Sequence, residues 1–172
     1  MKVKIYLEEG ATMPQRAHDD DFGWDVKATS KHDNTPLKGC VTYGTGIHLA
    51  FPPIDKDGKK VSLLLFARSS ICKKGLMLTN GVGISLNYPE NGVLSGDDMV
   101  LSNGVGVGDA GYRGEYKAVY YRVVGGSDYE IGDKIVQIAL SNGEDIEWEQ
   151  VATLEELGTT DRGSGGYGST GR

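Results

Sequence analysis

The chain is poor in cysteine and has no long hydrophobic run. Its two cysteines, Cys40 and Cys72, are too few for a disulfide framework, and neither lies in a metal-ligand pattern. No apolar stretch approaches the roughly 18 residues of a membrane-spanning helix, and the N-terminal residues lack the apolar core of a signal peptide. We therefore expect a soluble, intracellular (cytoplasmic) protein that does not enter a membrane, with both thiols packed in its interior.

Positive charge is also in short supply. The sequence has 18 Lys and Arg against 24 Asp and Glu, a net charge of −6. This balance excludes binding to nucleic acid or to an anionic membrane through bulk electrostatics. An anionic ligand would have to be held by locally placed Arg, Lys and backbone N–H groups. We therefore expect a small-molecule ligand and no direct contact with nucleic acid.

Helical periodicity is nearly absent, whereas glycine is abundant, at 26 of 172 residues. Short alternating or apolar runs separated by turn residues predict an all-β sandwich or barrel. The length fits one domain, which we place over residues 1–158, followed by a Gly-rich tail over 159–172. The predicted strands cover 3–7, 61–67 and 134–140, two short strands between 36 and 52, and a strand followed by one helical turn within 147–157.

The stretch GVGVGDAGYRGEYKAV, residues 104–119, places one carboxylate in a glycine-dense turn. Alternating runs on both sides of the glycines predict a β-hairpin. Asp109 lies in the turn, and Tyr112 and Arg113 follow it closely, a combination suited to a small polar ligand. The alternative is a turn aspartate that bonds only its own backbone.

Three further polar sites interrupt apolar segments. Arg68, Ser69 and Ser70 follow a buried strand, where a serine could cap a helical turn and leave N–H groups for a phosphate beside the arginine. A plain cap with a surface arginine is the alternative. Asp25 enters an alternating segment and could point into a cleft. Gln137 lies inside an apolar strand, so its amide must bond either backbone or a ligand.

Two segments do not fit the strand pattern. The tail, residues 159–172, has the composition of a flexible terminus or of a mobile lid that wraps a phosphate. Residues 84–102 separate two copies of Asn-Gly-Val-Gly, which begin at Asn80 and Asn103. We interpret 84–102 as an inserted loop or extra hairpin.

Five segments, in order, resemble the motifs of the trimeric deoxyuridine triphosphatase (dUTPase) family. Phe22 replaces the usual Ala of the first motif, Gly108 the usual aliphatic residue of the third, and Tyr167 the usual Phe of the fifth. The insertion at 84–102 lies outside the family pattern. The five segments are AHDDDFGWDV (17–26), Arg68-Ser69-Ser70 with Gly75, GVGDAGYRGE (106–115), GDKIVQ (132–137) and RGSGGYGSTG (162–171).

The resemblance implies a jelly-roll-like β-sandwich that forms a homotrimer, with each active site shared among three subunits. It also implies Mg²⁺-dependent hydrolysis of dUTP to dUMP and pyrophosphate, a reaction that keeps uracil out of DNA and supplies dUMP for dTMP synthesis. Asp109 would direct a water molecule onto the α-phosphorus and meet the sugar 3′-hydroxyl. Tyr112 would stack under the deoxyribose and exclude a ribose.

The same resemblance assigns the remaining site residues. Asn103 and the backbone of Val107 and Gly108 would bind the uracil edge, and Lys117 would line the site. Gln137 and Asp25 would lie near the phosphates and the waters of the metal. Arg68, Ser69 and Ser70 of a neighbouring subunit would contact the phosphates. The tail would close over the nucleotide, with Arg162 and Ser169 near the terminal phosphates, Tyr167 on the base and Gly168 also binding the substrate.

Three alternatives stay open at this point. The repeated Asn-Gly-Val-Gly means that Asn80 could replace Asn103 at the uracil. A deoxycytidine triphosphate deaminase shares Arg-Ser-Ser, but it would need a glutamate base at the pyrimidine and would lack the closing GSTG. A dUTP-binding interaction protein would use the same fold and contact a protein partner through residues 84–102.

Overall fold

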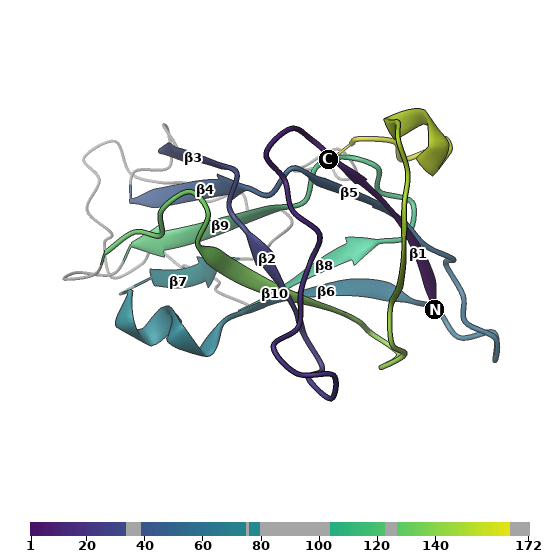
Figure 1. Ribbon diagram of the computed structural model, residues 1–172, viewed down its shortest axis with the longest axis horizontal. Coiled ribbons are helices and arrows are strands. Elements are labelled where there is room, and N and C mark those ends of the chain that lie inside the picture. The colour runs from purple at the N-terminus through teal and green to yellow at the C-terminus, as the bar shows by residue number, and fades with distance from the viewer. Residues whose placement is uncertain (34–38, 75, 80–103, 123–126, 166–172) are drawn as a thin grey trace, which may run out of the picture.

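The computed structural model describes residues 1–33, 39–74, 76–79, 104–122 and 127–165. These residues fold into strands and two short 3₁₀ helices (Figure 1). The elements are β1 Lys2–Leu7, β2 Trp24–Lys27, β3 Ser30–Asp33, β4 Cys40–Gly44, β5 Ile47–Ala50, β6 Ser62–Ala67, η1 Ser69–Lys73, β7 Leu76–Thr79, β8 Val105–Asp109, β9 Lys117–Arg122, β10 Lys134–Leu140, β11 Glu147–Gln150 and η2 Leu154–Leu157.

The strands form three open sheets. Their orders are β11-β1-β5, β2-β10-β6-β8 and β3-β4-β9-β7, and the neighbours are antiparallel except for β1 and β11. In Figure 1 the sheet of β3, β4, β9 and β7 lies to the left, and β1 and β5 lie to the right. This arrangement confirms the predicted all-β, jelly-roll-like sandwich, and every predicted strand is present within a few residues of its expected bounds.

One core joins the three sheets. Ile5, Leu63 and Tyr43 come from different sheets, and all are fully buried in the same cluster. Burial raises the pKa of the Tyr43 phenol to about 12. Cys40 is a buried free thiol whose pKa is raised by burial, as expected of a packing residue. No helix in the described ranges is long and apolar enough to cross a bilayer.

The predicted β-hairpin at 104–119 is wrong. β8 pairs with β6, whereas β9 pairs with β4 and β7, so the two strands belong to different sheets. Residues 110–116 carry the chain from one sheet to the other. The alternation located both strands correctly, but alternation does not determine which strand is the partner, because pairing depends on contacts distant in sequence.

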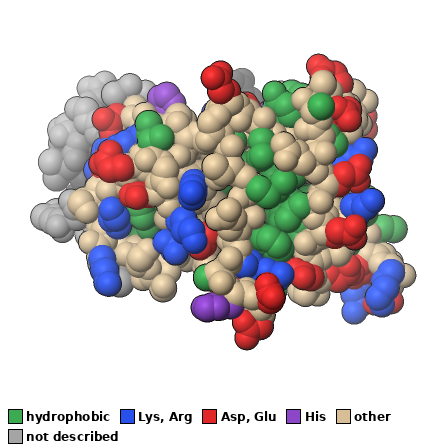
Figure 2. Space-filling view, in the orientation of Figure 1, with side chains coloured by type: hydrophobic (Ala, Val, Ile, Leu, Met, Phe, Trp, Pro, Cys, Tyr) green, Lys and Arg blue, Asp and Glu red, His purple; other side chains and the backbone are tan. Residues whose placement is uncertain are grey.

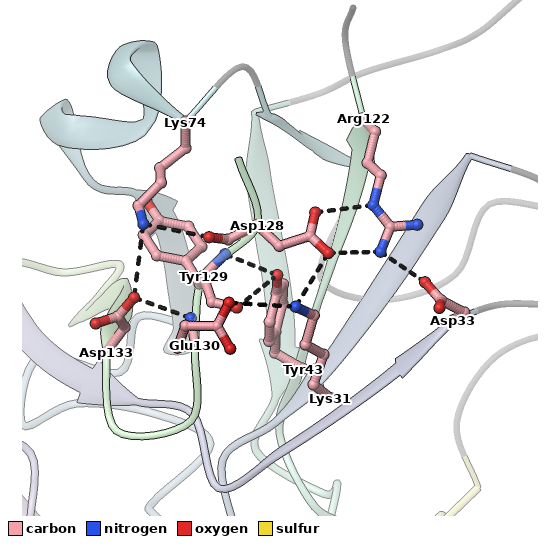
Figure 3. Close-up of polar contacts among 9 residues, drawn as sticks. All are labelled: Lys31, Asp33, Tyr43, Lys74, Arg122, Asp128, Tyr129, Glu130 and Asp133. Atoms are coloured by element: carbon pink, nitrogen blue, oxygen red, sulfur yellow. Dashed lines mark hydrogen bonds and ion pairs between the residues drawn. The ribbon is translucent and has the colours of Figure 1, made fainter. Parts of the chain in front are cut away.

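An ion-pair network stabilises residues 128–133, the segment that precedes β10 (Figure 3). The Asp128 carboxylate accepts from Arg122 Nε at 2.8 Å and Nη2 at 2.7 Å, and Lys31 Nζ lies 3.1 Å away. Arg122 also pairs with Asp33 at 2.6 Å. Hydrogen bonds from Arg122 are the main cause that lowers the pKa of Asp128 to about 2.

Lys74, which directly follows η1, contacts the same segment, residues 128–133, from the other side. Its ammonium donates to the Asp128 carbonyl at 3.2 Å and lies 3.7 Å from the Asp133 carboxylate. It also lies 5.1 Å from the centre of the Tyr129 ring, within range of a cation–π contact. Figure 3 shows these groups converging on residues 128–133, which border a basic hollow described below.

We expect Asp128→Asn to lower the free energy of unfolding at pH 7 by about 1 kcal/mol, a value reduced for solvent screening. Because the folded-state pKa of Asp128 is below its unfolded value, its contribution is present above about pH 4. The difference from the wild type should therefore vanish as the pH falls from 4 toward 2. Urea unfolding across this range measures it. Asp57→Asn, at an exposed carboxylate that pairs with its neighbour Lys56, is the control and should unfold like the wild type at each pH tested.

Candidate active site

Asp109 ends β8 on the outward face of its sheet. Val107 and Asp109 are exposed, whereas Gly106 and Gly108 face the interior. The Asp109 side chain is half exposed, and its carboxylate pairs with the guanidinium of Arg162. The structure therefore brings together two of the predicted site residues, one from the strand end and one from the tail.

Tyr112 lies beside this carboxylate in a tight loop. Its N–H donates to the Asp109 carbonyl at 3.0 Å, and its hydroxyl donates to the Glu115 carbonyl at 3.0 Å. A Cβ at Gly114 would overlap the Tyr112 hydroxyl, so this position requires glycine. The Arg162 guanidinium lies 5.8 Å from the centre of the Tyr112 ring. The half-buried ring and the carboxylate thus form one end of a site.

Arg113 is a structural residue of the loop, not a ligand group. Its guanidinium donates to the Ala110 carbonyl at 2.7 Å and to the Leu157 carbonyl at 3.1 Å. The backbone N–H of Arg113 donates to the Gly163 carbonyl at 2.8 Å. The Arg113 carbonyl lies 2.9 Å from His48 Nδ1. These contacts fix the loop against the core and against the start of the tail.

Glu115 anchors the other end of the loop, a role that sequence reasoning missed. Its Oε1 accepts from the N–H groups of Thr45 at 2.9 Å and Gly46 at 3.0 Å. Lys117, predicted to line the site, directs its ammonium to Glu115 Oε2 at 3.1 Å. The glutamate next to the Tyr112-Arg113-Gly114 segment was visible in sequence, but its partners lie 69 and 70 positions away.

The described part of the tail lies against the Asp109 loop. Thr160 Oγ1 donates to the Gly111 carbonyl at 2.5 Å, beside the Arg162 pair with Asp109. Other predicted positions lie outside the described residues, and so do the candidate uracil residues and the insertion. These are Tyr167, Gly168, Ser169, Asn80, Asn103 and residues 84–102.

A second cluster centres on Asp25 in β2, which is only 6% exposed. One carboxylate oxygen accepts from Arg68 Nε at 2.8 Å and the other from Lys134 Nζ at 2.9 Å. Gln137 pairs with Asp25 on one side and with Phe66 on the other, so the three side chains share one face of the sheet. Asp25, Arg68 and Gln137 are therefore neighbours within one chain.

Cationic side chains surround a hollow of about 440 Å³ next to this cluster. Figure 2 shows Lys and Arg side chains on both halves of this face, several of them at the left and others at the right edge. η1 begins at Ser69, and Arg68 occupies the N-cap position with no side-chain cap. The predicted serine cap is therefore wrong, because extended backbone continues through Arg68. The hollow is lined by Lys27, Arg68, Ser70, Lys74, Tyr129, Gly132, Asp133 and Lys134.

The two clusters lie at opposite ends of β6. Asp109 pairs with Ser62 at the start of β6, and Arg68 follows Ala67 at its end. Six residues of strand span about 20 Å. Within one copy of the chain, the backbones of Asp109 and Arg68 therefore lie at opposite ends of this strand.

The carboxylates of the described residues are too scattered for a metal cage made by protein alone. Within the described ranges, no group of three or more His, Cys, Asp or Glu side chains could hold a metal ion. Each oxygen of Asp25 accepts one hydrogen bond, and a carboxylate has about four acceptor positions, so positions remain that can accept from metal-bound water. Magnesium commonly binds in this way, mainly through substrate phosphates and water.

Together, the open β-sandwich, the exposed carboxylate beside an aromatic ring, and the basic hollow define a protein that binds a phosphorylated ligand. No protein-family model matches the chain. Curated relatives do match it, and they are named deoxyuridine 5′-triphosphate nucleotidohydrolase. The relative from Rickettsia bellii is 32% identical over 174 residues, which cover 99% of this chain and 95% of the relative. That from Rhodococcus erythropolis is 32% identical over 169 residues, which cover 96% and 82%.

The chain therefore belongs to the dUTPase family, which confirms the resemblance drawn from the five motifs. Solved structures agree on the fold. A dUTPase mutant from Staphylococcus bacteriophage 80alpha has a TM-score of 0.55 at 16% identity, covering 88% of this chain and 96% of that one. A dUTPase mutant from phage phi11 of S. aureus, described with a structural Mg(II) ion, has a TM-score of 0.54 at 18% identity, covering 88% and 97%.

Proposed function

We propose that this protein hydrolyses dUTP to dUMP and pyrophosphate. The observation that carries the proposal is the Asp109 carboxylate, exposed at the end of β8 beside Tyr112 in a chain of the dUTPase family. An ionised carboxylate is an acceptor only, so Asp109 would orient a water molecule and take its proton as the water attacks the α-phosphorus. The half-buried Tyr112 ring would stack against the deoxyribose. The backbone of Val107 and Gly108, with Asn103, would bind the uracil edge.

The basic hollow would hold the phosphates. Phosphoryl transfer is catalysed mainly by positioning and by neutralising charge, which suits a site with several cations. Asp25 fixes the Nε of Arg68 and the ammonium of Lys134, and this contact orients both cations at the edge of the hollow. Ser69, Ser70 and Gln137 would donate from the same region, while Lys27 and Lys74 are cations that sequence reasoning did not assign.

Magnesium would accompany the substrate. Bound to the triphosphate, Mg²⁺ neutralises charge on the phosphate oxygens. Asp25 would contact the ion through water, since both of its oxygens already accept a hydrogen bond from a cationic side chain. Arg162, Ser169 and Gly168 of the tail would lie near the terminal phosphates, with Tyr167 on the base.

We further propose a homotrimer in which Arg68 and its neighbours complete the site of another subunit. The separation of about 20 Å along β6 supports this arrangement, because it puts the backbones of Asp109 and Arg68 of one chain at opposite ends of the strand. An apolar surface lies between the two clusters: Leu64 pairs with Val107, and Phe66 pairs with Val105 on the outward face. Val107 is 45% exposed, as expected of a residue that another subunit covers.

Val107→Glu should therefore block assembly and reduce dUTP turnover by about 100-fold or more, because burying an unpaired carboxylate in a contact costs at least about 3 kcal/mol. Analytical ultracentrifugation reports the assembly state, and pyrophosphate release reports turnover. Ile54→Glu, at a residue 52% exposed in a surface loop, is the matched control. A monomeric Val107→Glu protein with full turnover would contradict the shared site.

One assay separates the proposed function from its rivals. Pyrophosphate release is measured with the four deoxynucleoside triphosphates, dUTP and UTP as separate substrates. We expect release from dUTP and little from any other. Ammonia release from dCTP would instead indicate a deaminase, and dUTP binding without turnover would favour an interaction protein.

A role in partner binding is a second proposal, for residues 84–102. Phage 80alpha dUTPases are described as controlling transfer of virulence genes, so a similar fold is associated with regulation in those proteins. In this chain the proposal rests on the sequence alone, because the insertion lies outside the described residues.

A further inference from the structure

Gly108 leaves a space that another residue fills. Its position faces the interior of the sheet, and a Cβ built there would lie 2.5 Å from Tyr116 Cε1 and 3.0 Å from its hydroxyl. Gly108 is not among the glycines with positive φ, so its backbone conformation does not demand glycine. The Tyr116 ring therefore occupies the volume that a side chain at position 108 would take.

The same ring supports Tyr112. The two rings are perpendicular, with centroids 5.2 Å apart, an edge-to-face geometry that favours a fixed orientation. Tyr116 is 2% exposed, and its N–H donates to the Ile47 carbonyl at 3.0 Å, which anchors it to β5. One buried side chain thus contacts both the backbone at Gly108 and the ring of Tyr112.

The Tyr116 hydroxyl makes no hydrogen bond with the described part of the chain. It is also buried. Burial is the main cause that raises the pKa of this phenol. A buried hydroxyl without a partner lowers stability. Within the described residues, the side-chain contacts of Tyr116 are therefore made by its ring.

We propose that Tyr116 is a positioning residue that sets the depth of the nucleoside subsite. It would fix the distance between the backbone of Val107–Gly108 and the Tyr112 ring, which under the proposed function bind the uracil and the deoxyribose. Discrimination between dUTP and dTTP depends on how closely this backbone approaches the base. In this chain that spacing depends on Tyr116, because position 108 has no side chain.

The experiment is a size-exchange cycle with Gly108→Ile, Tyr116→Val and the double variant. Gly108→Ile forces atoms into an occupied space, and Tyr116→Val opens a cavity, so each should raise the KM for dUTP more than it lowers kcat. We expect each to reduce the dUTP:dTTP ratio of kcat/KM by about tenfold or more. The double variant should return to within about threefold of the wild type, because the two volume changes offset each other.

Tyr116→Phe is the control that keeps the ring. It should preserve the dUTP:dTTP ratio and raise Tm by a few degrees, since only the unpartnered hydroxyl is removed. If Gly108→Ile does not fold, Gly108→Ala with Tyr116→Leu provides a milder pair. Folded single variants with an unchanged ratio, or losses that simply add in the double variant, would overturn the role of Tyr116. A wild type that does not hydrolyse dUTP would overturn the proposed function itself.

Discussion

Asp109→Asn is expected to lower dUTP turnover by about 10³-fold while nucleotide binding is retained. Asparagine has nearly the same size and shape as aspartate, but its amide cannot take a proton from water. The substitution should not disturb the fold, because the Asp109 side chain is half exposed and its ion pair is made to the tail. The loss should therefore fall on kcat and not on the affinity for dUMP.

Steady-state kinetics and calorimetric titration with dUMP measure the two quantities separately. Asp161→Asn is the matched control, since this exposed acid lies next to Arg162 but has no assigned role. The control should keep wild-type turnover. An Asp109→Asn enzyme within threefold of the wild type would show that another group activates the water.

The strands were predictable from sequence because alternation is local. VSLLLFA and KIVQIAL predicted β6 and β10 almost to the residue. The partners of the strands were not predictable in this way. β8 and β9 flank a short glycine-rich segment, yet they enter different sheets, because β8 pairs with β6 and β9 with β4 and β7.

The candidate site shows the same difference between residues that a local pattern identifies and residues whose roles depend on distant contacts. Asp109, Tyr112, Arg68, Asp25 and Gln137 were identified from residue type and motif, and the structure groups them into two clusters. The supporting residues were missed, because their contacts link distant parts of the chain. Glu115 caps the amides of Thr45 and Gly46, and Tyr116 fills the space beside Gly108. Neither role has a local sequence signal.

The division of the chain at residue 158 stays a prediction, but the described tail makes specific contacts. Removing residues 162–172 should leave a folded assembly whose kcat is reduced by about 100-fold or more. The fold should survive because Thr160, which bonds the Gly111 carbonyl, is kept. Turnover should fall because Arg162, the cation beside Asp109 and Tyr112, is lost.

A second truncation that removes only residues 166–172 separates the arginine from the rest of the tail. Arg162 pairs with one oxygen of the Asp109 carboxylate, Oδ2, and the other oxygen can accept from a water molecule. Arg162→Gln in the full chain should remove a cation from the phosphates, raising KM and lowering kcat together. If both truncations and Arg162→Gln retain wild-type turnover, the tail has no catalytic role, and charge neutralisation must come from the basic hollow alone.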